Sequence, residues 1–127
     1  MAGVSTLIEQ LLKVKDSYNC DALSIAGATA ALGDQQWLSE NRDKVLKTRQ
    51  VLESRLAELG FQVVPSQANF VWCTHLERSA KTLYEELKAE RVLVRYMNYP
   101  GWGEGLRISV GTGEQVSACL ELLKGKV

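Results

Sequence analysis

Arg107 is the residue whose surroundings best suit chemistry. It lies in Leu106-Arg107-Ile108-Ser109-Val110, a stretch that alternates apolar and polar side chains as a half-buried strand does. Arg107 and Ser109 should therefore project from the face opposite to the aliphatic side chains. A guanidinium on rigid backbone can bind a carboxylate through two parallel hydrogen bonds. A single strand arginine is more often a surface residue or an ion-pair partner, so the pattern by itself leaves both interpretations open.

Arg95 is a second candidate, because it lies within Val92 to Tyr96, a run that predicts a short strand. The segment that follows, Met97 to Gly105, is dense in Tyr, Trp, Pro and Gly, and a loop of this kind could cover a ligand site. Its Gly-x-Gly-x-Gly spacing leads into a strand and not into a helix, so it lacks the helix N-terminus that makes a phosphate-binding loop work. A flexible hairpin connection is the better interpretation of the glycines.

Other reactive side chains are few. His75 is the only histidine, and Cys73 lies two residues before it, but no second close pair completes a zinc site. No Ser or Cys forms an evident nucleophile–base pair, so we assign neither a catalytic residue nor a metal ligand. Cys20, Cys73 and Cys119 are an odd number without paired spacing, which disfavours disulfides and favours a reducing compartment. We interpret all three as small buried apolar residues.

Helical periodicity dominates the first 60 residues. Apolar spacing predicts an amphipathic helix over residues 5–15 and an alanine-rich helix over 22–32, which Asp21 can cap. A long helix should run over 34–59 until Gly60 ends it, with apolar residues on one side and charges on the other. It would be about 39 Å long at 1.5 Å per residue. Because a small domain does not need such a length for itself, we expect this helix to reach something beyond it.

After Gly60 the apolar period changes to two, the period of a strand. The expected elements are strands over 61–64, 69–74, 92–96 and 106–110, with helices over 79–90, where Ser79 is the cap, and over 114–123. The fold class is therefore α/β, in the form of an α+β two-layer sandwich with helices against a small sheet. We expect a single domain over 1–127, in which a helical segment over 1–60 precedes a ββαββα unit over 61–127.

Length and charge exclude several classes of protein. The chain has 127 residues, 14.1 kDa and 46% hydrophobic residues, enough for one domain with a core of its own. Fifteen Lys and Arg balance fifteen Asp and Glu, so no basic field favours nucleic acid or an anionic membrane. Apolar runs fall far short of the roughly 20 residues that span a bilayer. No basic segment of a signal peptide is present at the start. We expect a soluble, cytoplasmic protein with no nucleic-acid or membrane partner.

Several segments together resemble one known family. Gly105-Leu106-Arg107-Ile108-Ser109-Val110-Gly111-Thr112 resembles the C-terminal signature of the fold-type I pyridoxal phosphate aminotransferases, most of all the histidinol-phosphate aminotransferases. Other segments agree with the small domain of that family in order and spacing, and these are Lys13 to Asn19, Ala22 to Ser24, Pro65 to Val71 and Val92 to Arg95. The resemblance covers nearly the whole chain, and its joint specificity is high.

The resemblance implies substrate-binding roles for two arginines. Arg107 would bind the α-carboxylate of an amino-acid or 2-oxo-acid substrate, and Arg95 would lie beside the same site, helping with that carboxylate or with a side-chain phosphate. Asn69 would support the fold or the rim of the site. The family's Schiff-base lysine and phosphate-binding residues belong to a large domain that this sequence lacks. The chain alone is therefore expected to bind no pyridoxal phosphate and to be inactive.

Two hypotheses of different classes follow. In the first, the chain is the C-terminal domain of an aminotransferase of amino-acid and histidine biosynthesis, and the missing large domain is its partner. In the second, it is a stand-alone, non-catalytic module derived from this domain that binds a small molecule or a protein. In either case the first three helices would leave apolar faces uncovered, which predicts self-association into a homo-oligomer.

Overall fold

The computed structural model describes residues 3–17, 19–101 and 103–127. Their contacts divide the chain into two compact units, Met1–Leu38 and Ser39–Val127. The single domain expected over 1–127 stays a prediction.

The first unit is helical. It contains α1 (Ser5–Val14), α2 (Ala22–Gly33) and the start of α3 (Gln35–Glu58), and these helices agree with the predicted ones to within two residues at each end. Asp21 caps α2 as expected, because its carboxylate accepts the amide of Ser24 at 2.9 Å. No residue of α1 or α2 is buried, so neither helix has a core of its own.

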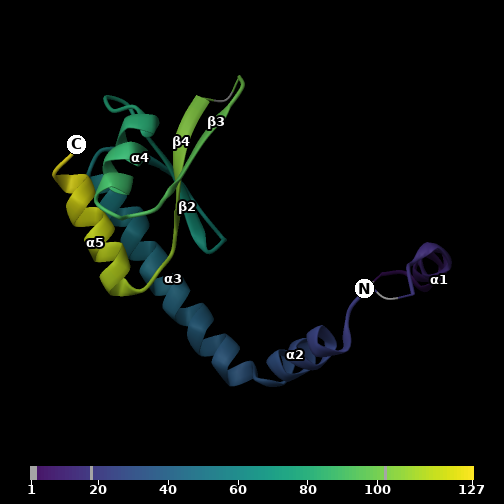
Figure 1. The fold of residues 1–127 in the computed structure, drawn as a ribbon. Helices are drawn as coiled ribbons and strands as arrows, with labels where there is room; N and C mark the ends of the chain where they lie inside the picture. Colours follow the sequence, from purple (N-terminus) through teal and green to yellow (C-terminus); the bar gives the residue numbers. More distant parts are fainter. Residues whose placement is uncertain (1–2, 18, 102) are drawn as a thin grey trace. The chain divides into compact units, whose positions relative to one another are not determined.

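The second unit is a two-layer sandwich, as predicted (Figure 1). Its strands β1 (Phe61–Val64), β2 (Phe70–His75), β3 (Arg95–Tyr99) and β4 (Gly103–Ser109) form one antiparallel sheet in the order β1-β2-β4-β3. Helix α4 (Ala80–Ala89) connects β2 to β3, and α5 (Gly113–Lys124) follows β4. The ββαββα order therefore holds, and β4 lies between two neighbours in the middle of the sheet.

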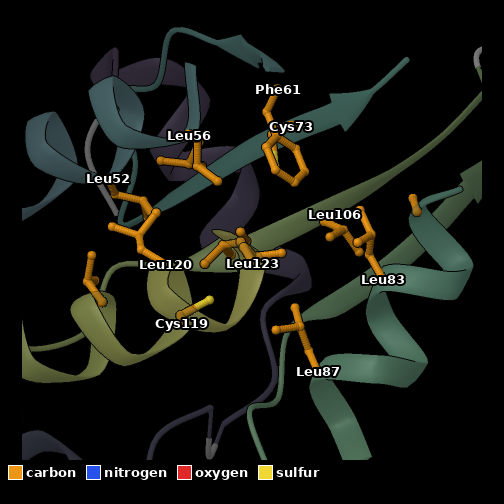
Figure 2. Close-up of a cluster of buried hydrophobic side chains, with 14 residues drawn as sticks. Leu52, Leu56, Phe61, Cys73, Leu83, Leu87, Leu106, Cys119, Leu120 and Leu123 are labelled. Carbon is orange, nitrogen blue, oxygen red and sulfur yellow. The ribbon is translucent and has the colours of Figure 1, made fainter. Parts of the chain in front are cut away.

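The core lies between one sheet face and three helices (Figure 2). Val71 and Cys73 of β2 are buried and alternate with residues of the opposite sheet face. Leu106 and Ile108 of β4 do the same, so each strand turns its apolar side inward. The helices supply Leu52 and Leu56 of α3, Leu83 and Leu87 of α4, and Val116, Cys119, Leu120 and Leu123 of α5. The apolar sides predicted for these helices are the ones buried. Only the C-terminal half of the long helix α3 carries buried residues.

The C-terminal end of α3 and the N-terminal end of α4 each depend on one particular residue. Gly60 follows α3 at φ +85°, where a side chain would be strained, and a β-carbon there would also approach the His75 ring. Ser79 precedes α4, but its side chain does not make the predicted cap. Instead, Glu104 of β4 accepts both the Ser79 hydroxyl, at 2.8 Å, and the Ala80 amide, at 2.9 Å. A carboxylate from a distant strand thus satisfies the free amide end of the helix.

The third strand differs from the prediction over 92–96. β3 begins only at Arg95 and continues to Tyr99, because Met97 to Tyr99 pair with β4 in a tight hairpin. The loop expected over 97–105 is therefore mostly paired strand, which agrees with the interpretation of its glycines as a hairpin connection. That this segment covers a ligand site stays a prediction. The connection between the strands is short, and Gly101 and Gly103 adopt φ of +80° and +89°.

Residues 92–94, which were expected in the strand, instead line a cavity of about 370 Å³. Its opposite wall comes from Ser109, Gly111 and the first turns of α5, including Gln115.

Among the described helices, none combines the length and the apolar character needed to cross a membrane.

Candidate functional site

The site lies on the sheet face that no helix of the second unit covers. We call this the open face and define it by the residues that alternate with the core positions: Gln62, Val64, Phe70, Trp72, Thr74, Arg95, Met97, Tyr99, Gly103, Gly105, Arg107 and Ser109. As predicted, Arg107 is on the side of β4 opposite to Leu106 and Ile108. The positions of the open face include no Asp or Glu.

The sheet register places the two arginines next to each other. Arg107 lies directly opposite Arg95 on β3 and directly opposite Trp72 on β2. Directly opposed residues of antiparallel strands have their β-carbons about 5 Å apart, and like charges in such a pair repel each other. With no carboxylate among the open-face positions, the pair forms a small positive area that an anion would neutralise.

The guanidinium of Arg107 is half-buried and lies over an aromatic ring. Its central carbon is 5.1 Å from the centroid of Phe70, a distance at which a cation is attracted to the ring face. The Nε atom of Arg107 is shielded from solvent, and it has no hydrogen-bond partner among the described residues. Buried donors in native proteins nearly always have a partner, so this atom is an unused donor beside the positive area.

Trp72 lies directly opposite Arg107 on β2. Its indole extends over Gly105, where a β-carbon would collide with it, and its ring centroid is 5.9 Å from that of Tyr99. Three aromatic residues, Phe70, Trp72 and Tyr99, and two arginines therefore occupy adjoining places on the open face. Such an arrangement can bind a small anion against an apolar wall and fix its orientation through the planar guanidinium.

The loop before β2 is held by charged residues of α3. Arg49 is buried, and its Nη1 donates to the Ala68 carbonyl at 2.8 Å, while Glu53 accepts the Ser66 amide at 3.1 Å. The Ser66 hydroxyl donates to the Phe70 carbonyl at 2.6 Å. These contacts fix the backbone from which Phe70 projects. Asn69, expected at the rim, is exposed, and its carbonyl accepts the Val110 amide at 2.8 Å.

The remaining sequence candidates are not part of the site. His75 packs edge-on against Phe61, with 4.9 Å between ring centroids, and its Nδ1 accepts the Glu77 amide at 3.2 Å. The described residues contain no group of three side chains that could hold a metal ion. Burial raises the pKa of Cys73 to about 12 and that of Cys119 to about 11, so both thiols stay protonated. Cys20 is exposed, so the prediction that all three cysteines are buried is wrong for it.

Sequence reasoning missed Phe70 and Trp72 as parts of the site. It identified their strand and its aromatic content, and the alternation of Phe70, Val71, Trp72 and Cys73 could have put both rings on one face. What the sequence does not contain is the register that sets this strand against β4. Without it, neither ring can be assigned to Arg107.

Comparisons with known proteins agree on one family. Residues 1–123 match the family described as aminotransferase class I and II. The chain is 52% identical over 118 residues to the histidinol-phosphate aminotransferase of Rhodopirellula baltica, covering 93% of this chain and 33% of that protein. It is 46% identical to histidinol-phosphate aminotransferase 1 of Bradyrhizobium diazoefficiens, covering 96% of this chain and 36% of that protein.

The fold is similar to a solved structure of the same kind. The crystal structure of the histidinol-phosphate aminotransferase from Clostridium acetobutylicum superimposes with a TM-score of 0.81 at 25% identity, over 88% of this chain and 35% of that one. The chain thus spans about a third of the length of the curated relatives it matches.

Proposed function

The chain belongs to the aminotransferase class I and II family, and from that premise we propose that it is the substrate-carboxylate-binding part of an aminotransferase similar to histidinol-phosphate aminotransferases. Arg107 binds the α-carboxylate of the amino-acid or 2-oxo-acid substrate. Arg95, directly opposite, adds a second positive charge for that carboxylate or for a phosphate on the substrate side chain.

The observation that carries this proposal is the state of Arg107. Its Nε is buried and has no hydrogen-bond partner among the described residues, a second arginine is its cross-strand neighbour, and the open-face positions offer no carboxylate. An internal ion pair would have supplied a partner to at least one of these guanidinium groups. An external carboxylate accounts for all three features, because it accepts two parallel hydrogen bonds and offsets the repulsion between the arginines.

The family depends on pyridoxal phosphate, and the residues of this chain do not fit that cofactor. A covalent attachment needs a lysine that is desolvated or placed beside another cation. Seven of the eight lysines are exposed and Lys126 is half-buried, in or beside helices, and these are Lys13, Lys15, Lys44, Lys47, Lys81, Lys88, Lys124 and Lys126. We therefore propose that cofactor attachment belongs to the part of the longer relatives that this chain does not cover.

The same part is the partner we propose for α1 and α2. Both helices have no buried residue, and large apolar side chains stand exposed on them, including Leu7 at 57% and Leu23 at 85% of their surface. Apolar area of this extent normally marks a contact with another protein surface.

An active fusion tests the role of Arg107. The chain is joined to the portion of the Rhodopirellula baltica relative that it does not cover, and transaminase activity is measured for the parent and for Arg107→Lys. Lys keeps the charge but loses the planar fork, at a cost of about 1.5–3 kcal/mol for a charge-assisted hydrogen bond. We expect kcat/KM for the amino acid to fall roughly tenfold to a hundredfold.

The matched control is Arg55→Lys, because Arg55 is exposed on α3 and pairs only with Glu58 at 2.9 Å among the described residues. It should leave kcat/KM unchanged. Thermal unfolding of the Arg107→Lys chain should stay close to that of the parent. A large loss of stability with unchanged kcat/KM would assign Arg107 to the fold and overturn the proposal.

A further inference from the structure

We propose that Phe70 is a positioning residue for Arg107: its ring face holds the guanidinium in the orientation that receives a carboxylate. The inference rests on the proposed function of Arg107, and it assigns to the aromatic side chain a role in substrate affinity in addition to its place in the strand.

The register of β2 against β4 brings Phe70 close to Arg107. Phe70 lies opposite Ser109 and is thus the diagonal neighbour of Arg107, within reach of a long side chain. The guanidinium carbon is 5.1 Å from the Phe70 centroid. Arg107 therefore extends along β4 towards Ser109, and the Phe70 ring forms the surface on which its charged end lies.

Trp72 is the residue directly opposite Arg107 on β2. Its indole leans the other way along the strand, over Gly105, where only the missing β-carbon leaves room for it. The two aromatic residues of β2 thus divide the space: Trp72 covers Gly105, and Phe70 contacts Arg107.

The Nε of Arg107 has no partner among the described residues, so no bond at that atom fixes the rotation of the guanidinium. Contact with a ring face restricts that rotation and lowers the entropy lost when a ligand binds. The backbone that carries the ring is anchored, because the Ser66 hydroxyl donates to the Phe70 carbonyl and Glu53 of α3 accepts the Ser66 amide.

The first test uses nuclear magnetic resonance on the 127-residue chain and its variants Phe70→Leu, Phe70→Tyr and Arg107→Lys. The Nε–H signal of Arg107, assigned by its loss in Arg107→Lys, should be displaced by the ring current of Phe70. Phe70→Leu should return the signal to the ordinary arginine range, and Phe70→Tyr, which keeps the ring, should not. An unchanged signal in Phe70→Leu would overturn the inference.

The second test measures affinity, using succinate as the carboxylate probe. A cation–ring contact at a partly exposed site is worth about 0.5–1 kcal/mol, so Phe70→Leu should weaken succinate binding about two- to fivefold, and Phe70→Tyr should restore it. In the active fusion, Phe70→Leu should raise KM for the amino acid and Phe70→Tyr should restore it, with little change in kcat. Equal affinities in the parent and Phe70→Leu would overturn the positioning role.

The two proposals fail in different ways. If Arg107→Lys leaves succinate affinity and kcat/KM unchanged, the proposed function of Arg107 is wrong. If Arg107→Lys lowers both and Phe70→Leu lowers neither, Arg107 binds substrate without help from Phe70. Thermal unfolding of each variant shows whether a loss reflects binding or the fold.

Discussion

Glu104 shows how a single side chain joins parts of the second unit. One of its oxygens accepts from Ser79 and Ala80 at the start of α4, and the other accepts the Tyr96 hydroxyl of β3 at 2.7 Å. These hydrogen bonds to the ionised form, above all that from Tyr96, hold the pKa of Glu104 below its usual value of 4.5. The same bond raises the pKa of Tyr96 above 10.0. Neither group has to do chemistry for these pKa shifts to arise.

Replacing Glu104 should therefore lower stability in a pH-dependent way. A lowered pKa in the folded state means that the contribution is complete above about pH 4.5 and is lost as the pH falls through the folded value. We expect Glu104→Gln to cost about 1 kcal/mol at pH 7, as for a helix N-cap, and to lower Tm by about 4–8 °C. The Tm difference from the parent should shrink when melting is repeated at pH 3.

The control for this prediction is Glu85→Gln, since Glu85 is an exposed residue of α4 and lies 4.0 Å from Lys88. It should change Tm little at either pH. A Glu104→Gln penalty of equal size at pH 3 and pH 7 would mean that the carboxylate charge contributes nothing.

The three thiols should react at very different rates with a reagent such as dithiobisnitrobenzoate. Cys73 and Cys119 are buried, with pKa values raised to about 12 and about 11, whereas Cys20 is exposed. In the native chain we expect one thiol per chain to react fast with the reagent, and this reaction should be absent in Cys20→Ser. The other two thiols should react only in denaturant. Fast reaction of all three thiols without denaturant would show that the core opens readily.

Among the elements, those predicted well are the ones whose pattern is local. α4 and α5 bury the apolar sides that their spacing indicates, and β4 shows the alternation that put Arg107 on the open face. The apolar side predicted for α3 likewise includes Leu52 and Leu56, which are fully buried.

What the sequence could not predict depends on partners far along the chain. β3 begins three residues later than expected because pairing with β4, and not the apolar run before Arg95, decides where a strand forms. The cap of α4 comes from Glu104, beyond the reach of any local motif. Cys20 was expected to be buried by its residue type, yet it lies in a unit whose first two helices bury no residue.

At the scale of the whole molecule, the uncovered apolar side chains of the first unit should cause self-association. We expect the apparent mass by light scattering to rise with concentration, and the double variant Leu7→Lys/Leu23→Lys to reduce that rise. Both residues are exposed and lie on helices, where Lys is well tolerated. Leu76→Lys is the control, because Leu76 is 79% exposed outside these helices. A constant monomer mass over a wide concentration range would contradict this expectation.

The strand order β1-β2-β4-β3 also has a consequence for biosynthesis. The ribosome makes β1 and β2 first, and this two-stranded hairpin is marginal in water until β4, the strand that joins it to β3, has left the exit tunnel. α5, which supplies four core residues, follows later still. At a translation rate of about 5–20 residues per second, roughly two to seven seconds pass between the synthesis of β2 and that of β4. During that interval the nascent sheet exposes Val71 and Cys73, so we expect the second unit to fold late in translation and to depend on chaperones until it does.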